Sequence, residues 1–199
     1  MKKILLPFLF TLIIMLQGCA TEPIFYHSEA SLPYFQHSTK TVFELIKDGN
    51  ASSSFQFGVI LAKDNDTLSY VLLAPTKEGK YANNLTDINL FCSIPLLPKQ
   101  VKEFINILNT SSDKWNSKFD SKNGINYEFM VSPENQIILQ SENVVAWYST
   151  LKYYFQNNED GPLGTLLFGE GKLNYFYKLN EISEIQKLIN MLNIAIKNM

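Results

Sequence analysis

The stretch from residue 88 to residue 109, INLFCSIPLLPKQVKEFINILN, joins a strand-like segment to a helix-like one. Every second residue from Ile88 to Ile94 is apolar, and side chains in a strand alternate between its two faces. Pro98 suits the first turn of a helix, and apolar residues then recur at the spacing i, i+3, i+4 and i+7. The stretch therefore predicts a strand that is followed by an amphipathic helix over residues 98–109.

The same order of elements recurs at the C-terminal end of the chain. Apolar residues 166–168 and 173–177 flank Gly169-Glu170-Gly171, and this arrangement predicts a hairpin. Asn180 can then cap a helix over residues 181–197, whose isoleucine and leucine residues follow helical spacing along one face.

A further hairpin is expected upstream of the first helix. Apolar residues alternate from Phe55 to Leu61, a second apolar run covers residues 68–74, and the polar residues 63–66 between them are typical of a turn. Together these patterns predict an α+β fold: an antiparallel sheet of about six to eight strands with two main helices, over residues 98–109 and 181–197. The elements would form two halves, each with its strands first and its helix last.

Three segments are harder to assign. Thr41 and Glu44 fit the capping box of a short helix ending at Gly49, but the same residues also fit a strand that turns at Asp48-Gly49. Residues 144–155 fit a helical face as well as a strand face, and their aromatic and β-branched residues favour the strand. Residues 157–164 are expected to form a loop.

The N-terminus has the three parts of an export signal. Lys2 and Lys3 give it a positive start, and residues 4–16 are almost entirely apolar. A membrane-spanning helix needs about 20 apolar residues, so this run is a signal segment rather than a permanent anchor. Residues 1–18 are therefore predicted to be removed from the mature protein.

The residues that end this segment, Leu16-Gln17-Gly18-Cys19, resemble the lipobox of bacterial lipoproteins. The resemblance covers only the signal segment, and Gln17 departs from the small residue that is usual at its position. It implies that a diacylglyceryl group is attached to the thiol of Cys19. It also implies that a lipoprotein signal peptidase cleaves the chain between Gly18 and Cys19.

A lipid anchor fixes the expected domain organisation and location. Two or more acyl chains hold a protein firmly, since each buried methylene contributes about 0.8 kcal/mol. We expect a signal peptide over residues 1–18, a lipidated tether over residues 19–40 and a single α+β domain over residues 41–199. Ala20 stands where lipoproteins of the inner membrane carry Asp, so the resemblance favours the outer membrane if the organism has two membranes.

Composition argues against nucleic acid as a partner. The whole chain has a formal net charge of −2, and removal of Lys2 and Lys3 with the signal peptide makes the remainder more negative. All the basic residues are lysine, whereas arginine is the preferred side chain for paired contacts with phosphate and guanine.

No catalytic, cofactor or metal site is predicted. Cys92 could act as a nucleophile, but a small buried side chain in a strand is the simpler interpretation. Both histidines, His27 and His37, lie in a repeated Pro-x-Phe-x-His-Ser pattern without a carboxylate or cysteine at a recognised metal-ligand spacing. Because only Cys92 remains once Cys19 is acylated, an intrachain disulfide is excluded.

Aromatic residues are the best candidates for binding. Trp147, Tyr148, Tyr153 and Tyr154 lie close together in the sequence, and flat amphipathic rings can stack on sugars or anchor a peptide. We therefore expect a non-enzymatic envelope lipoprotein that binds a protein or glycan or builds an assembly. The alternative is an exported hydrolase of an envelope or nutrient polymer, with Glu128, Glu134 or Asp160 brought together by the fold.

Overall fold

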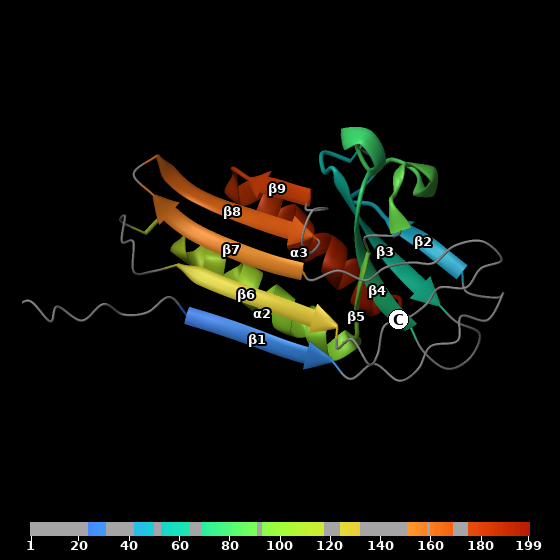
Figure 1. The fold of residues 1–199 in the computed structure, drawn as a ribbon, viewed down its shortest axis with the longest axis horizontal. Helices are drawn as coiled ribbons and strands as arrows, with labels where there is room; N and C mark the ends of the chain where they lie inside the picture. The colour runs from blue at the N-terminus through green and yellow to red at the C-terminus, as the bar shows by residue number, and fades with distance from the viewer. Residues whose placement is uncertain are drawn as a thin grey trace, which may run out of the picture.

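The computed structural model of the chain describes residues 24–30, 42–49, 53–63, 69–90, 93–117, 124–131, 151–158, 160–168 and 175–199. These residues form two β-sheets that lie side by side, with two long helices packed against them (Figure 1). The described elements confirm an α+β fold. The single sheet expected from the sequence is instead divided into a five-stranded and a four-stranded sheet.

The five-stranded sheet has the order β1-β6-β7-β8-β9. Its strands are β1 (Ile24–Ala30), β6 (Ile125–Val131), β7 (Leu151–Asn158), β8 (Gly161–Phe168) and β9 (Tyr175–Leu179). Strand β1 runs parallel to β6 over all seven of its residues, and the other neighbours are antiparallel. Residues 24–30 are therefore part of the sheet, which corrects the prediction that they belong to a tether.

The four-stranded sheet has the order β2-β3-β4-β5 and is antiparallel throughout. Its strands are β2 (Val42–Ile46), β3 (Phe57–Lys63), β4 (Ser69–Pro75) and β5 (Ile94–Leu96). Two short 3-10 turns, η1 (Lys77–Gly79) and η2 (Leu85–Asp87), lie between β4 and β5. Strand β3 pairs with β4 from Phe57 to Lys63, as the predicted hairpin requires.

Each sheet is followed in the sequence by one helix. Helix α2 (Pro98–Trp115) follows β5, and helix α3 (Ile182–Lys197) follows β9. The Gln100 side chain accepts a hydrogen bond from the Leu97 backbone N–H at 2.8 Å, which stabilises the start of α2. Helix α2 continues six residues past its predicted end at Asn109, because Trp115 packs on Phe155 of β7 with ring centroids 5.8 Å apart.

Of the two alternatives for residues 41–49, the strand is observed and the capped helix is wrong: β2 pairs with β3 along its whole length, and the chain turns at Asp48-Gly49. The expected loop over residues 157–164 is largely strand, because β7 and β8 remain paired as far as Asn158 and Gly161. Of the segment 144–155, only residues 151–155 are described, and they are in a strand as expected.

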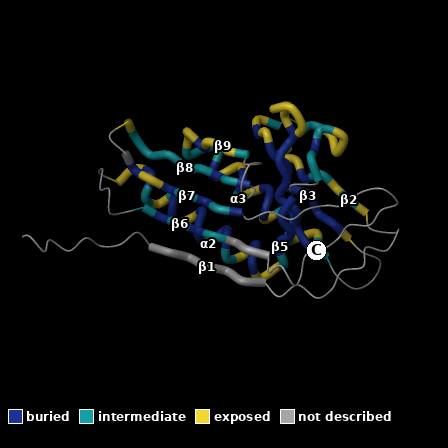
Figure 2. Tube along the Cα trace, viewed as in Figure 1, coloured by how far each residue is buried: buried dark blue, intermediate teal, exposed yellow. Residues whose placement is uncertain are grey.

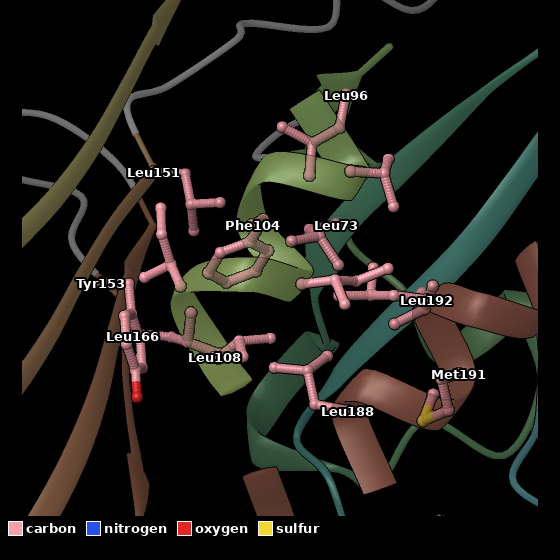
Figure 3. Close-up of a cluster of buried hydrophobic side chains, with 14 of the residues drawn as sticks. Leu73, Leu96, Phe104, Leu108, Leu151, Tyr153, Leu166, Leu188, Met191 and Leu192 are labelled. Atoms are coloured by element: carbon pink, nitrogen blue, oxygen red, sulfur yellow. The ribbon is translucent and has the colours of Figure 1, made fainter. Parts of the chain in front are cut away.

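One hydrophobic core joins the two sheets and both helices. Figure 3 shows side chains from α2, α3 and both sheets converging around Phe104 and Leu192. The Phe104 ring stacks on Tyr127 of β6 at 5.3 Å and meets Tyr153 of β7 edge-on at 5.8 Å. Because both sheets contribute to it, this core holds them as one body.

The opposite face of the four-stranded sheet is also buried. A second cluster there includes Ile60, Leu72 and Ile88, and residues 57–62 and 70–75 are buried throughout. Figure 2 shows this burial as dark blue along β3. A Cβ added at Gly58 would approach the Ile88 side chain to 2.7 Å, so Gly58 permits the close contact that covers this face.

Candidate binding site

The structure separates the aromatic residues that the sequence singles out. Tyr153 is fully buried in the core, whereas Tyr154, on the opposite face of β7, is half-buried. Trp147 and Tyr148 lie outside the described residues. A buried ring cannot stack on a ligand, so the structure corrects the prediction for Tyr153 and leaves Tyr154 as a candidate.

Burial changes the chemistry of Tyr153. It raises the pKa of this phenol far above the ordinary value of 10.0, and the neighbouring hydroxyl of Ser111 offsets part of the rise. The Ser111 hydroxyl itself donates to the backbone oxygen of Ile107 at 3.0 Å. Within the described residues, the Tyr153 hydroxyl has no partner in hydrogen-bonding geometry. The Tyr153 ring therefore belongs to the core and is closed to solvent.

The carboxylates proposed for a hydrolase do not come together where the structure describes them. Glu128 on β6 forms an ion pair with Lys152 on β7, with 2.7 Å between the carboxylate oxygen and the ammonium nitrogen. Asp160 lies in the turn after β7, and the strand from Lys152 to Asn158 alone spans about 20 Å at about 3.3 Å per residue. Paired carboxylates of glycosidases lie about 5–9.5 Å apart, so Glu128 and Asp160 cannot form such a pair. Glu134 lies outside the described residues.

A hollow between the two sheets is a better candidate site. Residues 54–57, which lead into β3, form one wall, and residues 176–179 of β9 form the other, with Tyr81 and Glu184 at its rim. The hollow has a volume of about 190 Å³ and is open to solvent, so it is smaller than the ligand sites of about 300–1,000 Å³ that enclose drug-sized molecules. In Figure 1, β9 lies at the edge of its sheet and faces the green loops between β4 and β5.

Two of the residues that line this hollow have exposed aromatic side chains. Phe176 is 63% exposed and Tyr81 is 53% exposed. Only two other large hydrophobic side chains among the described residues, Val42 and Leu85, are classed as exposed, and neither lines the hollow. The most exposed rings of the described structure are therefore gathered at one place.

Backbone hydrogen bonds fix the wall that carries Tyr81. The Ala82 N–H donates to the Phe55 oxygen and the Thr76 N–H donates to the Gln56 oxygen, both at 3.0 Å. The Gln56 side-chain amide also donates to the Gly79 oxygen at 2.9 Å. Residues 76–82 are thus held against residues 55 and 56, so this side of the hollow is formed before a ligand arrives.

Charged and polar groups complete the lining. Glu184 lies in the first turn of α3, where its Oε2 accepts from the backbone N–H groups of Asn180 at 2.6 Å and Glu181 at 3.1 Å. These bonds hold the carboxylate in place beside the hollow. Lys178, on the same strand as Phe176, is exposed and adds an ammonium group. The site can stack a flat apolar face and bind hydroxyl or charged groups around it.

A second, smaller hollow shares Ser54 and Phe55 with the first. Ile46, Lys47 and Asp48 line it from the end of β2, and Lys187 and Met191 line it from α3. Asn190 of α3 donates from its side-chain amide to the Asp48 carboxylate at 2.5 Å. The segment 53–55 therefore separates two neighbouring depressions along the side of α3.

The described residues contain no group of three or more His, Cys, Asp or Glu side chains that could hold a metal ion. In the same residues, helices with the length and hydropathy of a membrane span are absent.

No protein-family model matches the chain, and no curated protein matches its sequence. Among solved structures, MRP1/MRP2 of trypanosoma bruciei is similar with 12% identity and a TM-score of 0.30, covering 79% of this chain and 84% of that one. The plant transcriptional regulator PBF-2 is similar with 11% identity and a TM-score of 0.30, covering 85% of this chain and 90% of that one. At such low TM-scores, these likenesses carry no argument about this protein.

The sequence did not indicate this site. Tyr81 and Phe176 are 95 positions apart, and each stands in a segment without a recognised motif. One available signal was the alternation along residues 172–180: Phe176 shares its strand face with Asn174 and Lys178, whereas Tyr175, Tyr177 and Leu179 share the apolar face. The other signal was the polar stretch around Tyr81, where an isolated aromatic residue has no neighbouring apolar pattern to join.

Proposed function

We propose that this protein is a lipid-anchored lipoprotein of the bacterial cell envelope and acts as a non-enzymatic binding module. The motif Leu16-Gln17-Gly18-Cys19, directly after a short apolar run, carries this proposal. Acyl chains on Cys19 fix the mature protein to a membrane outside the cytoplasm, and Ala20 favours the outer membrane where two are present. The folded remainder then presents its surface to other components of the envelope.

The hollow at Tyr81 and Phe176 is the proposed binding site, and a glycan is the ligand that its chemistry favours. The exposed rings can stack on the C–H faces of sugar rings, and Glu184 and Lys178 can bind hydroxyl and charged groups. The ammonium group of Lys178 beside the exposed rings favours a ligand that carries hydroxyl or anionic groups over a purely apolar one. The proposal therefore combines a location in the cell envelope with a binding site that suits an envelope glycan.

A cysteine substitution tests the anchor. Cys19→Ala removes the thiol that accepts the diacylglyceryl group, so cleavage after Gly18 should stop and residues 1–18 should be retained. The variant should accumulate as a larger precursor that incorporates no alkyne-labelled fatty acid. Cys92→Ala is the matched control, which should be processed and labelled like the natural protein. Normal cleavage and labelling of Cys19→Ala would contradict the proposal.

Ring removal tests the binding site. Tyr81→Ala and Phe176→Ala should each weaken retention on purified insoluble cell-wall glycan about tenfold, equivalent to about 1.4 kcal/mol, because each removes one stacking surface. Leu85→Ala is the matched control, since Leu85 is exposed and lies outside the hollow. Co-sedimentation measures the effect. Equal losses in all three variants, or no retention of the natural protein, would rule out this site for glycan.

A further inference from the structure

We infer that the lipid anchor keeps one particular end of the five-stranded sheet in the half of the domain that is nearer the bilayer, so that the orientation of the protein on the membrane is restricted. The inference rests on the proposed acylation of Cys19. It adds that only a short length of chain connects the lipidated Cys19 to the paired strand β1, in place of the long tether expected from the sequence.

The length of the connection follows from where β1 begins. Strand β1 starts at Ile24, so only residues 20–23 separate it from Cys19. A fully extended chain spans at most about 3.6 Å per residue, which places the start of β1 within about 18 Å of Cys19. The tether expected from the sequence, with residues 19–40 available, would have spanned up to about 75 Å.

The short connection limits how the domain can turn. A compact chain of this size has a radius of gyration of about 16 Å and hence a diameter of about 40 Å. When one point on such a body stays within about 18 Å of the bilayer, the opposite pole must stay at least about 20 Å away. The end that carries Ile24 therefore lies in the half of the domain that is nearer the lipid.

Strand register identifies what else lies at that end. Ile24 pairs with Ile125, Ile125 pairs with Phe155, and Phe155 pairs with Gly164, so these four positions lie at one level across the sheet. Beyond this level lies the turn between β7 and β8, which contains the exposed Asp160. Figure 1 shows the start of β1 and this turn at the same end, away from the four-stranded sheet.

The C-terminal end of α2 belongs to the same region. The Asn157 side-chain amide donates to the backbone oxygen of Ser117 at 2.9 Å, which fixes the residues after α2 beside the end of β7. The ionisable side chains described at this end include Asp113, Lys114, Asp160, Lys178 and Glu181, and they have mixed charge. They form no basic cluster that would attract anionic lipid. The short connection, rather than surface charge, sets the orientation.

This orientation keeps the candidate binding site accessible. Phe176 pairs with Leu167, whereas Leu179 pairs with Gly164 at the level of Ile24. The exposed ring therefore lies about 10 Å further along the strands, on the side away from the bilayer, at about 3.3 Å per residue.

Fluorescence quenching on vesicles tests the inference. Asp160→Cys and Lys63→Cys place a bimane label at the turn near β1 and at the exposed end of β3 in the other sheet, in a Cys92→Ser background. The full-length lipidated protein is bound to phosphatidylcholine vesicles doped with a headgroup-nitroxide lipid. We expect the label at position 160 to be quenched several-fold more than the label at position 63. Equal quenching would overturn the inference.

A lengthened connection is the control. Twenty Gly and Ser residues inserted after Ala20 add a flexible chain of about 25 Å root-mean-square length, so the two labels should then be quenched alike. A difference that persists with the insertion would mean that surface attraction, and not the short connection, sets the orientation. Flotation with the vesicles is scored separately. If the natural protein does not float, the anchor itself is wrong and the inference falls with it.

Discussion

Tyr153 places a phenol hydroxyl inside the core between β7 and α2, where Ser111 is a polar neighbour but donates to Ile107 and does not meet the phenol in hydrogen-bonding geometry. A buried polar group without a partner costs about 1–3 kcal/mol. We expect Tyr153→Phe to be neutral or to stabilise the fold by about 1 kcal/mol in urea denaturation, and Tyr153→Ala to destabilise it by about 3–5 kcal/mol. Tyr154→Phe is the control and should change stability little. A large loss in Tyr153→Phe would show that the hydroxyl has a partner.

Alkaline pH gives a second test of the same residue. The folded-state pKa of Tyr153 lies above the unfolded value of 10.0, so above that pH the unfolded chain loses a proton that the folded protein keeps. Stability is therefore lost as pH rises beyond 10, by about 1.4 kcal/mol per pH unit from this one group. Urea denaturation of the natural protein and Tyr153→Phe at about pH 9 and about pH 11 should show a shallower loss in the variant. Parallel losses would contradict a buried, protonated phenol.

Tyr153 and Tyr154 are neighbours on β7, and only one of the two rings is buried in the core. Neighbouring side chains in a strand point to opposite faces, so of Tyr153 and Tyr154 only one can be in the core. Leu151 and Phe155 share the face of Tyr153, whereas Lys152 and Gln156 share the face of Tyr154, so the alternation indicates that Tyr153 is the buried ring. The structure agrees, since Phe104 of α2 meets Tyr153.

Helices and hairpins whose residues are close together in the sequence were predicted correctly. The apolar stripe of α3, with Ile185 and Leu192, and the β3–β4 hairpin depend on residues that are close in sequence. Strand β1 could not be found in this way, because it pairs with β6 about 100 positions later. The parallel pairing of β1 and β6 leaves no turn signal between adjacent strands.

The helix α3 offers a test of how the core is held together. Leu192 is fully buried where α3 meets the shared core, and the next residue, Asn193, is exposed (Figure 3). Leu192→Ala should destabilise the protein by about 2–5 kcal/mol, because it removes buried methyl groups and leaves a cavity. Asn193→Ala should stay within about 0.5 kcal/mol of the natural protein in the same thermal or urea unfolding experiment. Similar effects of both would argue against this packing.

On the scale of the whole molecule, one shared core ties both sheets together, and the hollow at Tyr81 and Phe176 exists only because the sheets meet. No segment of the sequence contains that site by itself, which is why it could not be predicted. The predicted export and lipidation signal differs from the binding site in this respect. It consists of a few consecutive residues, and it does not depend on the fold of the described residues.

The N-terminal residue of the mature protein tests the central claim most directly. Protein extracted from membranes would be digested, and its N-terminal peptide would be analysed by mass spectrometry. The account predicts a peptide that begins at Cys19 and carries a diacylglyceryl group on sulfur. An unmodified Cys19, or a chain that begins elsewhere, would contradict the anchor and the function built on it.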